Sequence, residues 1–574
     1  MPEKKRPGSS KKTPASEKLN RSPKPRTRKP AETKPPGRVP ARTRRADEPE
    51  SASARVIAPP DVSPAAQPVP AAPAPRAGGQ PLHVVMVASE AHPFAKTGGL
   101  AEVTGALPDA LARLGHRVTL IVPRYRGVNP GAYVGASHEH GGATTSVPSG
   151  TLTLGARSQH VEYHALPLSE RVTAVLVGAP DLFEREGLYG DASGDYADNA
   201  YRFAVFGRAA LEYVRLAGER PSVIHAHDWQ AGLVPVYQKM QFSENPIVGG
   251  VPAMFTIHNL AFQGLFPSSV LPSLGLGWEV MNIQALEFWG QISFLKGGVN
   301  FSEKITTVSP RYAQEVLTRE LGFGFDGVLR RRVDDLVGIL NGIDVRRWNP
   351  ADDEFVGTRF SADDLSAKTE AKRELLAAVG LPTDDAGLGR PVIGLVSRLT
   401  DQKGFDLIEA AAPDLMALDA TWVMLGSGER RYEEMWTSIA AAHPRRVSAT
   451  IGFDERLAHL IEAGADIFLM PSRFEPCGLN QMYSLRYGTV PVVRAVGGLD
   501  DTVVDFDGRQ GTGFKFRDYT PAALVAALQR ALDVYRDKPT WSRLQQAGMR
   551  LDYSWDASAR EYVKVYEAMV NGGI

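Results

Sequence analysis

From His83 onward the chain repeats one pattern: a short run rich in β-branched residues, a turn with glycine or polar residues, then an amphipathic segment of helical length. These runs predict strands at residues 84–88, 118–122, 223–226, 253–257, 305–308, 392–396, 422–425, 448–451, 467–470 and 490–493. Strands that alternate with helices predict parallel sheets covered by helices on both faces. The pattern therefore predicts an α/β protein.

The length of the chain predicts more than one domain. Its 574 residues exceed what a single hydrophobic core usually organises, so two domains of roughly two hundred residues each are expected. We predict one Rossmann-like, doubly wound domain over residues 81–337 and a second over residues 338–555. The hinge between them is expected at residues 338–342.

Residues 1–80 differ from the rest in composition. Pro, Ala, Lys, Arg and Ser dominate this segment, and it has almost no aromatic or β-branched clusters, so it cannot bury enough surface to offset its chain entropy. We predict a disordered basic tail, with tethering to an anionic surface as the alternative role. A plastid transit peptide is disfavoured because such peptides are rich in serine.

Charge and cysteine content exclude several classes of function. The chain has 65 basic and 65 acidic residues, and the tail holds an excess of the basic ones, so the folded body is net acidic and is not expected to bind nucleic acid. The single cysteine, Cys477, excludes an intrachain disulfide and fits a reducing, cytoplasmic location; we interpret it as a small buried hydrophobe. No run of eighteen apolar residues predicts a membrane span.

Candidate ligand-binding residues follow predicted strands, where open parallel sheets bind their ligands. Glu475 and the helix start near Gly478 come directly after the strand at residues 467–470. Backbone N–H groups at such a helix start bind a diphosphate, and the carboxylate accepts hydrogen bonds from sugar hydroxyls. Lys96 and the glycines that follow it form a second phosphate-type loop, although alone they would be an ordinary turn. Two such loops predict a ligand between the domains.

Five spaced motifs together resemble the bacterial glycogen synthases and the related plant starch synthases. They are Lys96-Thr97-Gly98-Gly99-Leu100, His225-Ala226-His227-Asp228-Trp229, Thr256-Ile257-His258-Asn259, Ser397-Arg398-Leu399 with Gln402-Lys403-Gly404, and the segment around Glu475. The resemblance extends from about residue 84 to about residue 569. It implies the GT-B glycosyltransferase architecture, in which two Rossmann-like domains face a cleft and the last helix, within residues 556–574, crosses back to the first domain.

The resemblance implies a retaining transfer of glucose from ADP-glucose to the non-reducing end of an α-1,4-glucan such as glycogen, without a cofactor. Arg398 and Lys403, five residues apart, would neutralise the departing diphosphate, a task otherwise given to a metal. Glu475 and His258 would orient the transferred sugar. We prefer attack by the acceptor on the front face over a covalent intermediate on Glu475, because no second carboxylate is positioned to work with it.

Two further sets of residues are assigned through the same resemblance. The nucleotide-sugar and phosphate set is Lys96, Gly98, Gly99, Gly478, Leu479, Asn480 and Phe453, with Phe453 packing on the base. The sugar set is Asn341, Asp228, Trp229 and Glu102. Relatives usually carry aspartate at the position of Glu102 and often histidine at that of Gln230, so the sugar contacts there differ. His225, His227 and Asp228 do not have the spacing of a closed metal site, and no metal is predicted.

Three alternatives remain open at this point. The same reaction could use UDP-glucose or another nucleotide sugar. The chain could instead be a weakly catalytic glucan-binding protein recruited through its tail, which the complete set of motif residues disfavours. The turn Gly426-Ser427-Gly428 resembles half of a dinucleotide fingerprint, but no G-x-G-x-x-G follows the opening strand, so a dehydrogenase is the least favoured alternative.

Overall fold

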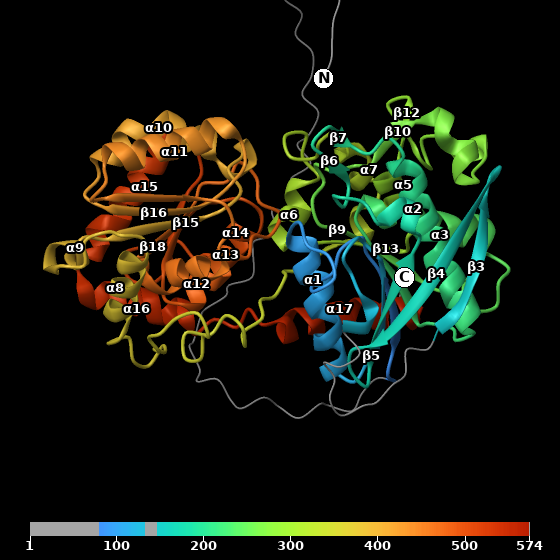
Figure 1. Ribbon diagram of the computed structural model, residues 1–574, viewed down its shortest axis with the longest axis horizontal. Coiled ribbons are helices and arrows are strands. Elements are labelled where there is room, and N and C mark those ends of the chain that lie inside the picture. Colours follow the sequence, from blue (N-terminus) through green and yellow to red (C-terminus); the bar gives the residue numbers. More distant parts are fainter. Residues whose placement is uncertain (1–79, 133–145, 573–574) are drawn as a thin grey trace, which may run out of the picture. The chain divides into compact units, whose positions relative to one another are not determined.

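The computed structural model describes residues 80–132 and 146–572, all of which belong to one compact unit. The predicted disordered tail lies outside the described residues except for Gln80. Two sheets organise the described chain (Figure 1). All ten predicted strands are present, each within one residue of its predicted ends. This confirms the α/β class.

The first sheet has nine strands in the order β14-β13-β9-β8-β1-β2-β5-β4-β3. In chain order they are β1 (His83–Val87), β2 (Arg117–Pro123), β3 (Ser146–Leu154), β4 (Arg157–Pro167), β5 (Val172–Gly178), β8 (Val223–His227), β9 (Ala253–Ile257), β13 (Lys304–Thr307) and β14 (Leu336–Gly338). All pairings are parallel except those of β4, which runs antiparallel to both β3 and β5. Short connections on both sides of β4 allow only antiparallel neighbours, so this edge departs from the predicted parallel sheet.

Helices cover both faces of the first sheet. One face packs against α1 (Gly99–Arg113) and α17 (Trp555–Val570), and the other against α3 (Asn199–Ala217), α4 (Leu233–Gln241) and α5 (Phe294–Phe301). Alternate residues of β1 divide between the two cores, because successive strand side chains point to opposite faces. Val84 and Met86 join Tyr562 of α17, whereas Val85 and Val87 face the other core. The last helix of the chain thus completes the core beside one of its first strands.

The second sheet has six parallel strands in the order β17-β16-β15-β18-β19-β20. They are β15 (Val392–Val396), β16 (Thr421–Gly426), β17 (Val447–Ile451), β18 (Ile467–Met470), β19 (Val490–Arg494) and β20 (Phe514–Phe516). Its faces are covered by α8 (Lys368–Ala378) and α12 (Glu455–Gly464) on one side, and by α10 (Phe405–Ala417), α11 (Arg430–Ala442) and α15 (Pro521–Tyr535) on the other. We call each sheet with its helices a lobe. The residue limits given above for the two domains stay a prediction.

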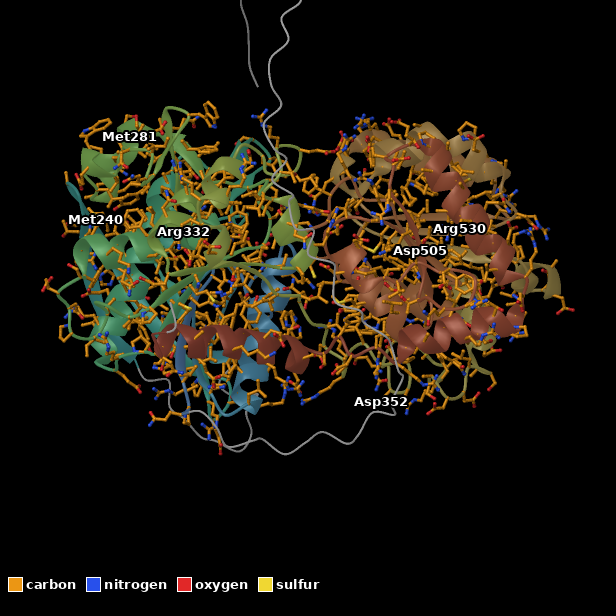
Figure 2. The ribbon with its side chains drawn as sticks, turned by 180° about the vertical axis from the view of Figure 1, so that it is seen from behind. Met240, Met281, Arg332, Asp352, Asp505 and Arg530 are labelled. Atoms are coloured by element: carbon orange, nitrogen blue, oxygen red, sulfur yellow. The ribbon has the colours of Figure 1, made fainter. Side chains whose placement is uncertain are left out.

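The three basic residues Arg330, Arg331 and Arg332, which precede the expected hinge, belong to the folded structure. Arg332, which is labelled in Figure 2, pairs with Asp335 at 2.8 Å and donates to the carbonyls of Val299 and Ser302 at 2.6 and 2.7 Å. These bonds fix the chain where it enters β14. No helix within residues 80–132 or 146–572 combines the length and apolarity that crossing a membrane requires.

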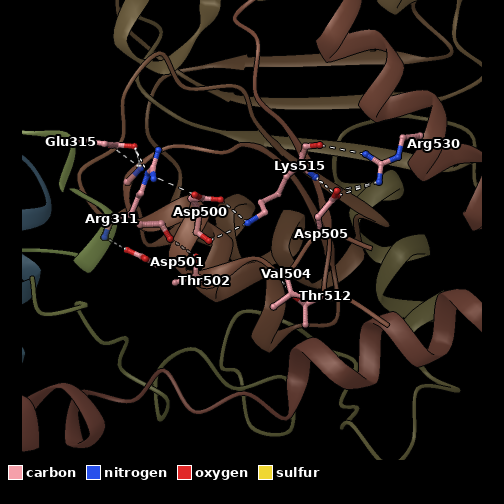
Figure 3. Close-up of polar contacts among 12 residues, drawn as sticks. Arg311, Glu315, Asp500, Asp501, Thr502, Val504, Asp505, Thr512, Lys515 and Arg530 are labelled. Carbon is pink, nitrogen blue, oxygen red and sulfur yellow. Dashed lines mark hydrogen bonds and ion pairs between the residues drawn. The ribbon is translucent and has the colours of Figure 1, made fainter. Parts of the chain in front are cut away.

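A polar network joins α6 (Pro310–Glu315) of the first lobe to α14 (Gly497–Thr502) of the second (Figure 3). The backbone N–H of Arg311 donates to Asp501 Oδ2 at 2.9 Å. The N–H of Gly497 donates to both carboxylate oxygens of Glu315, at 3.1 and 3.0 Å. Burial raises the pKa of both carboxyl groups. Since both acceptors are carboxylates, the lobes are joined by charge-assisted bonds.

Candidate active site

The centre of the site is an ion pair between residues that follow two neighbouring strands. Lys403 ends the turn after β15, and Glu475 lies in the loop after β18. Lys403 Nζ donates to Glu475 Oε2 at 2.7 Å, and Ser472 Oγ donates to the same oxygen at 3.0 Å. Glu475 is only 4% exposed, so its charge is offset by these two donors rather than by water. The sequence placed both residues in the site but not in contact with each other.

Glycines bring the Glu475 loop against α14. Gly497 has φ +44°, and a Cβ there would lie 1.9 Å from the carbonyl oxygen of Glu475. A Cβ on Gly498 would lie 2.1 Å from the carbonyl oxygen of Cys477. Gly478, at φ +72°, then turns the chain toward α13 (Asn480–Arg486). Only glycine tolerates this approach, so the loop geometry depends on residues about twenty positions further along the chain.

Lys403, one member of the ion pair, lines a cavity of about 310 Å³. Seven of the predicted site residues line it: Gly98, Arg398, Lys403, Phe453, Gly478, Leu479 and Asn480. Arg398 is exposed, and Phe453 is 84% exposed at the end of β17. The side chain of Asn480 donates to the Val396 carbonyl at 2.7 Å, which ties the start of α13 to the end of β15. Two cations, a glycine turn and an aromatic ring therefore surround one space.

The Lys96 loop reaches this cavity from the first lobe. Thr97 lines it beside Gly98, and the backbone of the loop is open, since no atom lies within 4 Å of a Cβ placed on Gly98 or Gly99. Buried Glu90 fixes the loop by accepting from Thr97 N at 2.5 Å and Thr97 Oγ1 at 2.6 Å. Lys96 itself pairs with Glu102, so the residue assigned to the sugar contacts the residue assigned to the phosphate.

Three histidines form a buried column behind the site. His225 Nδ1 bonds with the hydroxyl of Tyr566 at 2.8 Å, and His227 Nδ1 bonds with His258 Nε2 at 3.0 Å. The rings of His225 and His227 contact each other at a tilt of 38°, with 3.9 Å between their centroids. Burial lowers the pKa of all three, to about 3 for His258. The column is therefore neutral at physiological pH, and His258 offers the site a neutral hydrogen-bonding imidazole.

Asp228 and Trp229 are held by the fold. Asp228 has φ +54°, and its Oδ1 accepts from the backbone N–H of His258 at 2.7 Å. Burial raises the Asp228 pKa to about 7. The Trp229 ring lies edge-on to Phe203 at 5.0 Å, and a Cβ on Gly264 would come within 2.6 Å of it. Trp229 therefore packs in the aromatic core of the first lobe.

Asn341 follows β14 and is 6% exposed. Its Oδ1 is buried and accepts no hydrogen bond from any residue that the structure describes. A buried amide oxygen without a donor is costly in a native protein, so a ligand hydroxyl is a fitting partner. Cys477 nearby is buried, and burial raises its pKa to about 12, which fits the predicted small hydrophobe rather than a reactive thiol.

Six predicted residues of the second lobe line one cavity, whereas Glu475 does not line it and pairs with Lys403, which does. The lining also does not include Lys96, Gly99, Glu102, Asp228, Trp229, His258 or Asn341. Sequence reasoning missed Glu90, Thr97 and Ser472. Glu90 follows β1 and Ser472 follows β18, so the rule that sites lie beyond the carboxyl ends of strands was the signal that could have found them. Within the described ranges no cluster of three His, Cys, Asp or Glu side chains could hold a metal ion.

Two family descriptions match the two lobes in order. "Starch synthase catalytic domain" matches residues 83–331, and "Glycosyl transferases group 1" matches residues 385–548. Glycogen synthase from Anaeromyxobacter dehalogenans is 50% identical over 494 residues, which cover 86% of this chain and all of that protein. Glycogen synthase from Myxococcus xanthus is 46% identical over 85% of this chain and all of the relative. That from Koribacter versatilis is 44% identical over 85% of this chain and 98% of the relative.

Solved structures agree with these relatives. The catalytic domain of starch synthase IV from Arabidopsis thaliana, bound to ADP and acarbose, matches with a TM-score of 0.77 at 33% identity, covering 86% of this chain and all of that chain. Sucrose-phosphate synthase from Thermosynechococcus elongatus shares the fold, with 17% identity and a TM-score of 0.54. The match covers 86% of this chain and all of that chain. The chain therefore belongs to the glycogen and starch synthase family and is a glycosyltransferase of the GT-B fold.

Proposed function

We propose that this enzyme transfers glucose from ADP-glucose to the non-reducing end of an α-1,4-glucan, with retention of configuration, and so elongates glycogen. The observation that carries the proposal is Lys403, which pairs with Glu475 at 2.7 Å and lines a cavity together with Arg398 and the Gly478 turn. The starch synthase IV structure with the same fold is bound to ADP and acarbose, which supports an adenosine diphosphate donor here. The glycogen synthase relatives support glycogen as the acceptor.

In the proposed reaction the bond between the anomeric carbon of glucose and the diphosphate oxygen breaks. Arg398 and Lys403 stabilise the negative charge that develops on the leaving ADP, as preorganised cations in a partly water-excluded site do. Glu475 stabilises the oxocarbenium-like sugar. The acceptor hydroxyl then attacks the same face, forms the new glycosidic bond, and gives its proton to the departing diphosphate.

The other residues have positioning roles in this proposal. Asn341 Oδ1 accepts from a sugar hydroxyl, and neutral His258 hydrogen-bonds the sugar without adding a positive charge beside the developing cation. Phe453 packs on the base, for which its exposed ring is suited. Lys96 and the open backbone of the Gly98–Gly99 turn approach the diphosphate, and Glu102 and Asp228 border the sugar. A cytoplasmic location and contact of the basic tail with an anionic surface are also part of the proposal.

The test measures incorporation of radiolabelled glucose into a glycogen primer by the purified protein, from ADP-glucose and from UDP-glucose in parallel. We expect transfer from ADP-glucose at the higher kcat/KM, unchanged by EDTA. Faster transfer from UDP-glucose would mean that UDP-glucose is the donor instead. Glycogen binding without transfer from any nucleotide sugar would favour the non-catalytic alternative.

Lys403→Ala is expected to lower kcat by about a hundredfold or more, since it removes one electrostatic donor. Full activity of this variant, or a strict need for a divalent ion, would contradict the assignment.

A further inference from the structure

Two tight turns of the first lobe place an aromatic residue where the backbone disfavours one. Trp289 and Gly290 form the two-residue loop between β11 (Glu287–Phe288) and β12 (Gln291–Ser293), with φ values of 52° and 79°. Phe323 and Gly324 are the centre of a second turn, closed by a backbone hydrogen bond of 2.7 Å, with φ values of 47° and 80°. Positive φ at both central positions is the type I′ pattern, whose first position favours asparagine, aspartate or glycine.

Both aromatic residues are also exposed. The Trp289 side chain is 81% exposed and that of Phe323 is 37% exposed, although large apolar side chains normally pack inside. Such a residue strains the turn and leaves its ring in water, so it stabilises neither the turn nor the hydrophobic core. Backbone strain of this kind in bulky residues concentrates at ligand sites.

The two turns share a buried base. A Cβ placed on Gly324 would lie 3.7 Å from both Phe288 Cζ and Trp289 Nε1, so the turns touch. Beneath them the rings of Phe288 and Phe325 pack at 4.4 Å, and both side chains are buried. The exposed rings therefore stand on a fixed support rather than on a loose loop.

This support connects directly to the candidate active site. The ring of Phe323 meets that of Phe474 edge-on at 5.1 Å, and Phe474 is the residue before Glu475. Gln263, in the loop that follows His258, donates to the Phe323 carbonyl at 2.9 Å. We call Phe474, Phe323 and Trp289 the aromatic rim. It leads outward from the ion pair to the protein surface.

We infer that the aromatic rim is a remote acceptor subsite, which stacks glucose units of an α-1,4-glucan several residues away from its reacting end. This inference rests on the proposed function. The C–H face of a glucose ring packs on an aromatic face while its hydroxyl groups remain at the edge in water. Three aromatic rings between Glu475 and the surface offer separate contacts to successive sugars, whereas a protein partner would bury one contiguous apolar patch. Continuity with Glu475 makes the growing glucan the occupant.

The deciding variant is Trp289→Asn. Asparagine suits the first position of a type I′ turn, so we expect a melting temperature equal to or above that of the wild type. With ADP-glucose as donor, the ratio of kcat/KM for maltoheptaose to that for maltose should fall about tenfold, because only the longer acceptor reaches the rim. Trp289→Phe should restore most of this ratio, since it keeps an aromatic face.

The matched control is Trp278→Ala. Trp278 is 61% exposed in a nearby turn, but among the described residues it makes no ring contact with the rim. Its acceptor ratio should equal that of the wild type. Retardation in glycogen-containing native gels measures binding without donor or turnover, and Trp289→Asn should be retarded less than Trp278→Ala. An unchanged ratio with unchanged retardation would overturn the subsite. A wild type that binds glycogen but transfers no glucose would instead overturn the proposed function and leave the rim's binding role intact.

Discussion

The side chains of Lys403 and Glu475 partly neutralise each other, which shapes what a substitution at either position does. Glu475→Gln keeps the size of the side chain but removes the charge that Lys403 contacts at 2.7 Å. Lys403 then remains available to a diphosphate. We expect kcat to fall by about a hundredfold or more, while the Kd for ADP changes by less than about threefold.

Ser472→Ala is the matched control, because it removes one neutral hydrogen bond to the same Glu475 oxygen and leaves the charge. Its loss of kcat should be smaller than that of Glu475→Gln. The measurement combines steady-state kinetics with calorimetric titration of ADP. Equal losses of turnover and ADP affinity in Glu475→Gln would mean that Glu475 supports the nucleotide or the fold.

The buried histidine column makes stability depend on pH. Burial depresses the folded-state pKa values of His225, His227 and His258. Below pH 6.5 these three imidazoles therefore become protonated in the unfolded chain but stay neutral in the folded protein. Asp228, with its pKa raised to about 7, opposes this by binding one proton in the folded state as the pH falls from 7 toward 4. From these four groups the net excess of protons on the unfolded chain grows from about one at pH 6.5 to about two near pH 5, so their contribution to the unfolding free energy falls by about 3 kcal/mol over this interval.

Urea denaturation at a series of pH values measures this slope. Because desolvation rather than surface charge causes it, the slope should persist in 1 M salt, where exposed ion pairs are screened. A flat profile between pH 6.5 and 5 would contradict the neutral, buried column.

At the scale of elements, the contact between the start of α14 and the Glu475 loop sets the shape of the site. Gly497→Ala combines a positive φ with a Cβ 1.9 Å from the Glu475 carbonyl, so the loop must move. We expect a large loss of kcat together with a lower melting temperature. Gly508→Ala is the control, since its φ is +97° but no atom lies within 4 Å of the added Cβ.

Gly508→Ala should cost only the left-handed strain of about 1–2 kcal/mol and leave kcat unchanged. Thermal melts and glucose incorporation decide between the two effects. If both variants lose the same stability and neither loses turnover, the Glu475 loop does not depend on α14.

The same scale shows what the sequence could predict. Continuous apolar runs such as residues 467–470 are buried on both faces of a parallel sheet, so their pattern alone identifies ten strands. The strands β3 and β4 were not predicted, because the residues of β4 alternate in polarity and one of its faces is half exposed. The strand β5 was also missed, although it is a nearly continuous buried apolar run of the kind that identified the ten predicted strands. Strands of two or three residues, such as β11, carry no periodicity at all.

In the site, position after a strand predicted Glu475, Lys403 and Arg398. Their mutual geometry was out of reach, because the Lys403–Glu475 bond joins residues 72 positions apart through side-chain conformation. The strained Trp289 was equally invisible, since a tryptophan before a glycine gives no sign of its backbone angle.

At the scale of the whole molecule, the amino-terminal tail is predicted to be dispensable for catalysis. Deleting residues 1–78 should leave kcat on a soluble primer and the melting temperature nearly unchanged, because a segment of this composition builds no core. Binding to anionic vesicles should weaken, and in the full-length protein it should weaken with salt, since exposed charges are screened within about 8 Å at physiological ionic strength. Unfolding or loss of turnover in the truncated protein would mean that the tail packs on the enzyme.

The position of α17 has a consequence for synthesis on the ribosome. Tyr566 bonds with His225 across 341 positions, and Tyr562 joins Val84 and Met86 in one core. Domains generally fold as they emerge, the amino-terminal one first. Here, α1 covers only part of one face of the earliest sheet, and the rest of that face stays uncovered until α17 leaves the exit tunnel. All helices that cover the second sheet are therefore synthesised before the last helix that covers the first sheet. Until then, the nascent chain depends on chaperones or on rapid completion to keep the exposed part of that face from aggregating.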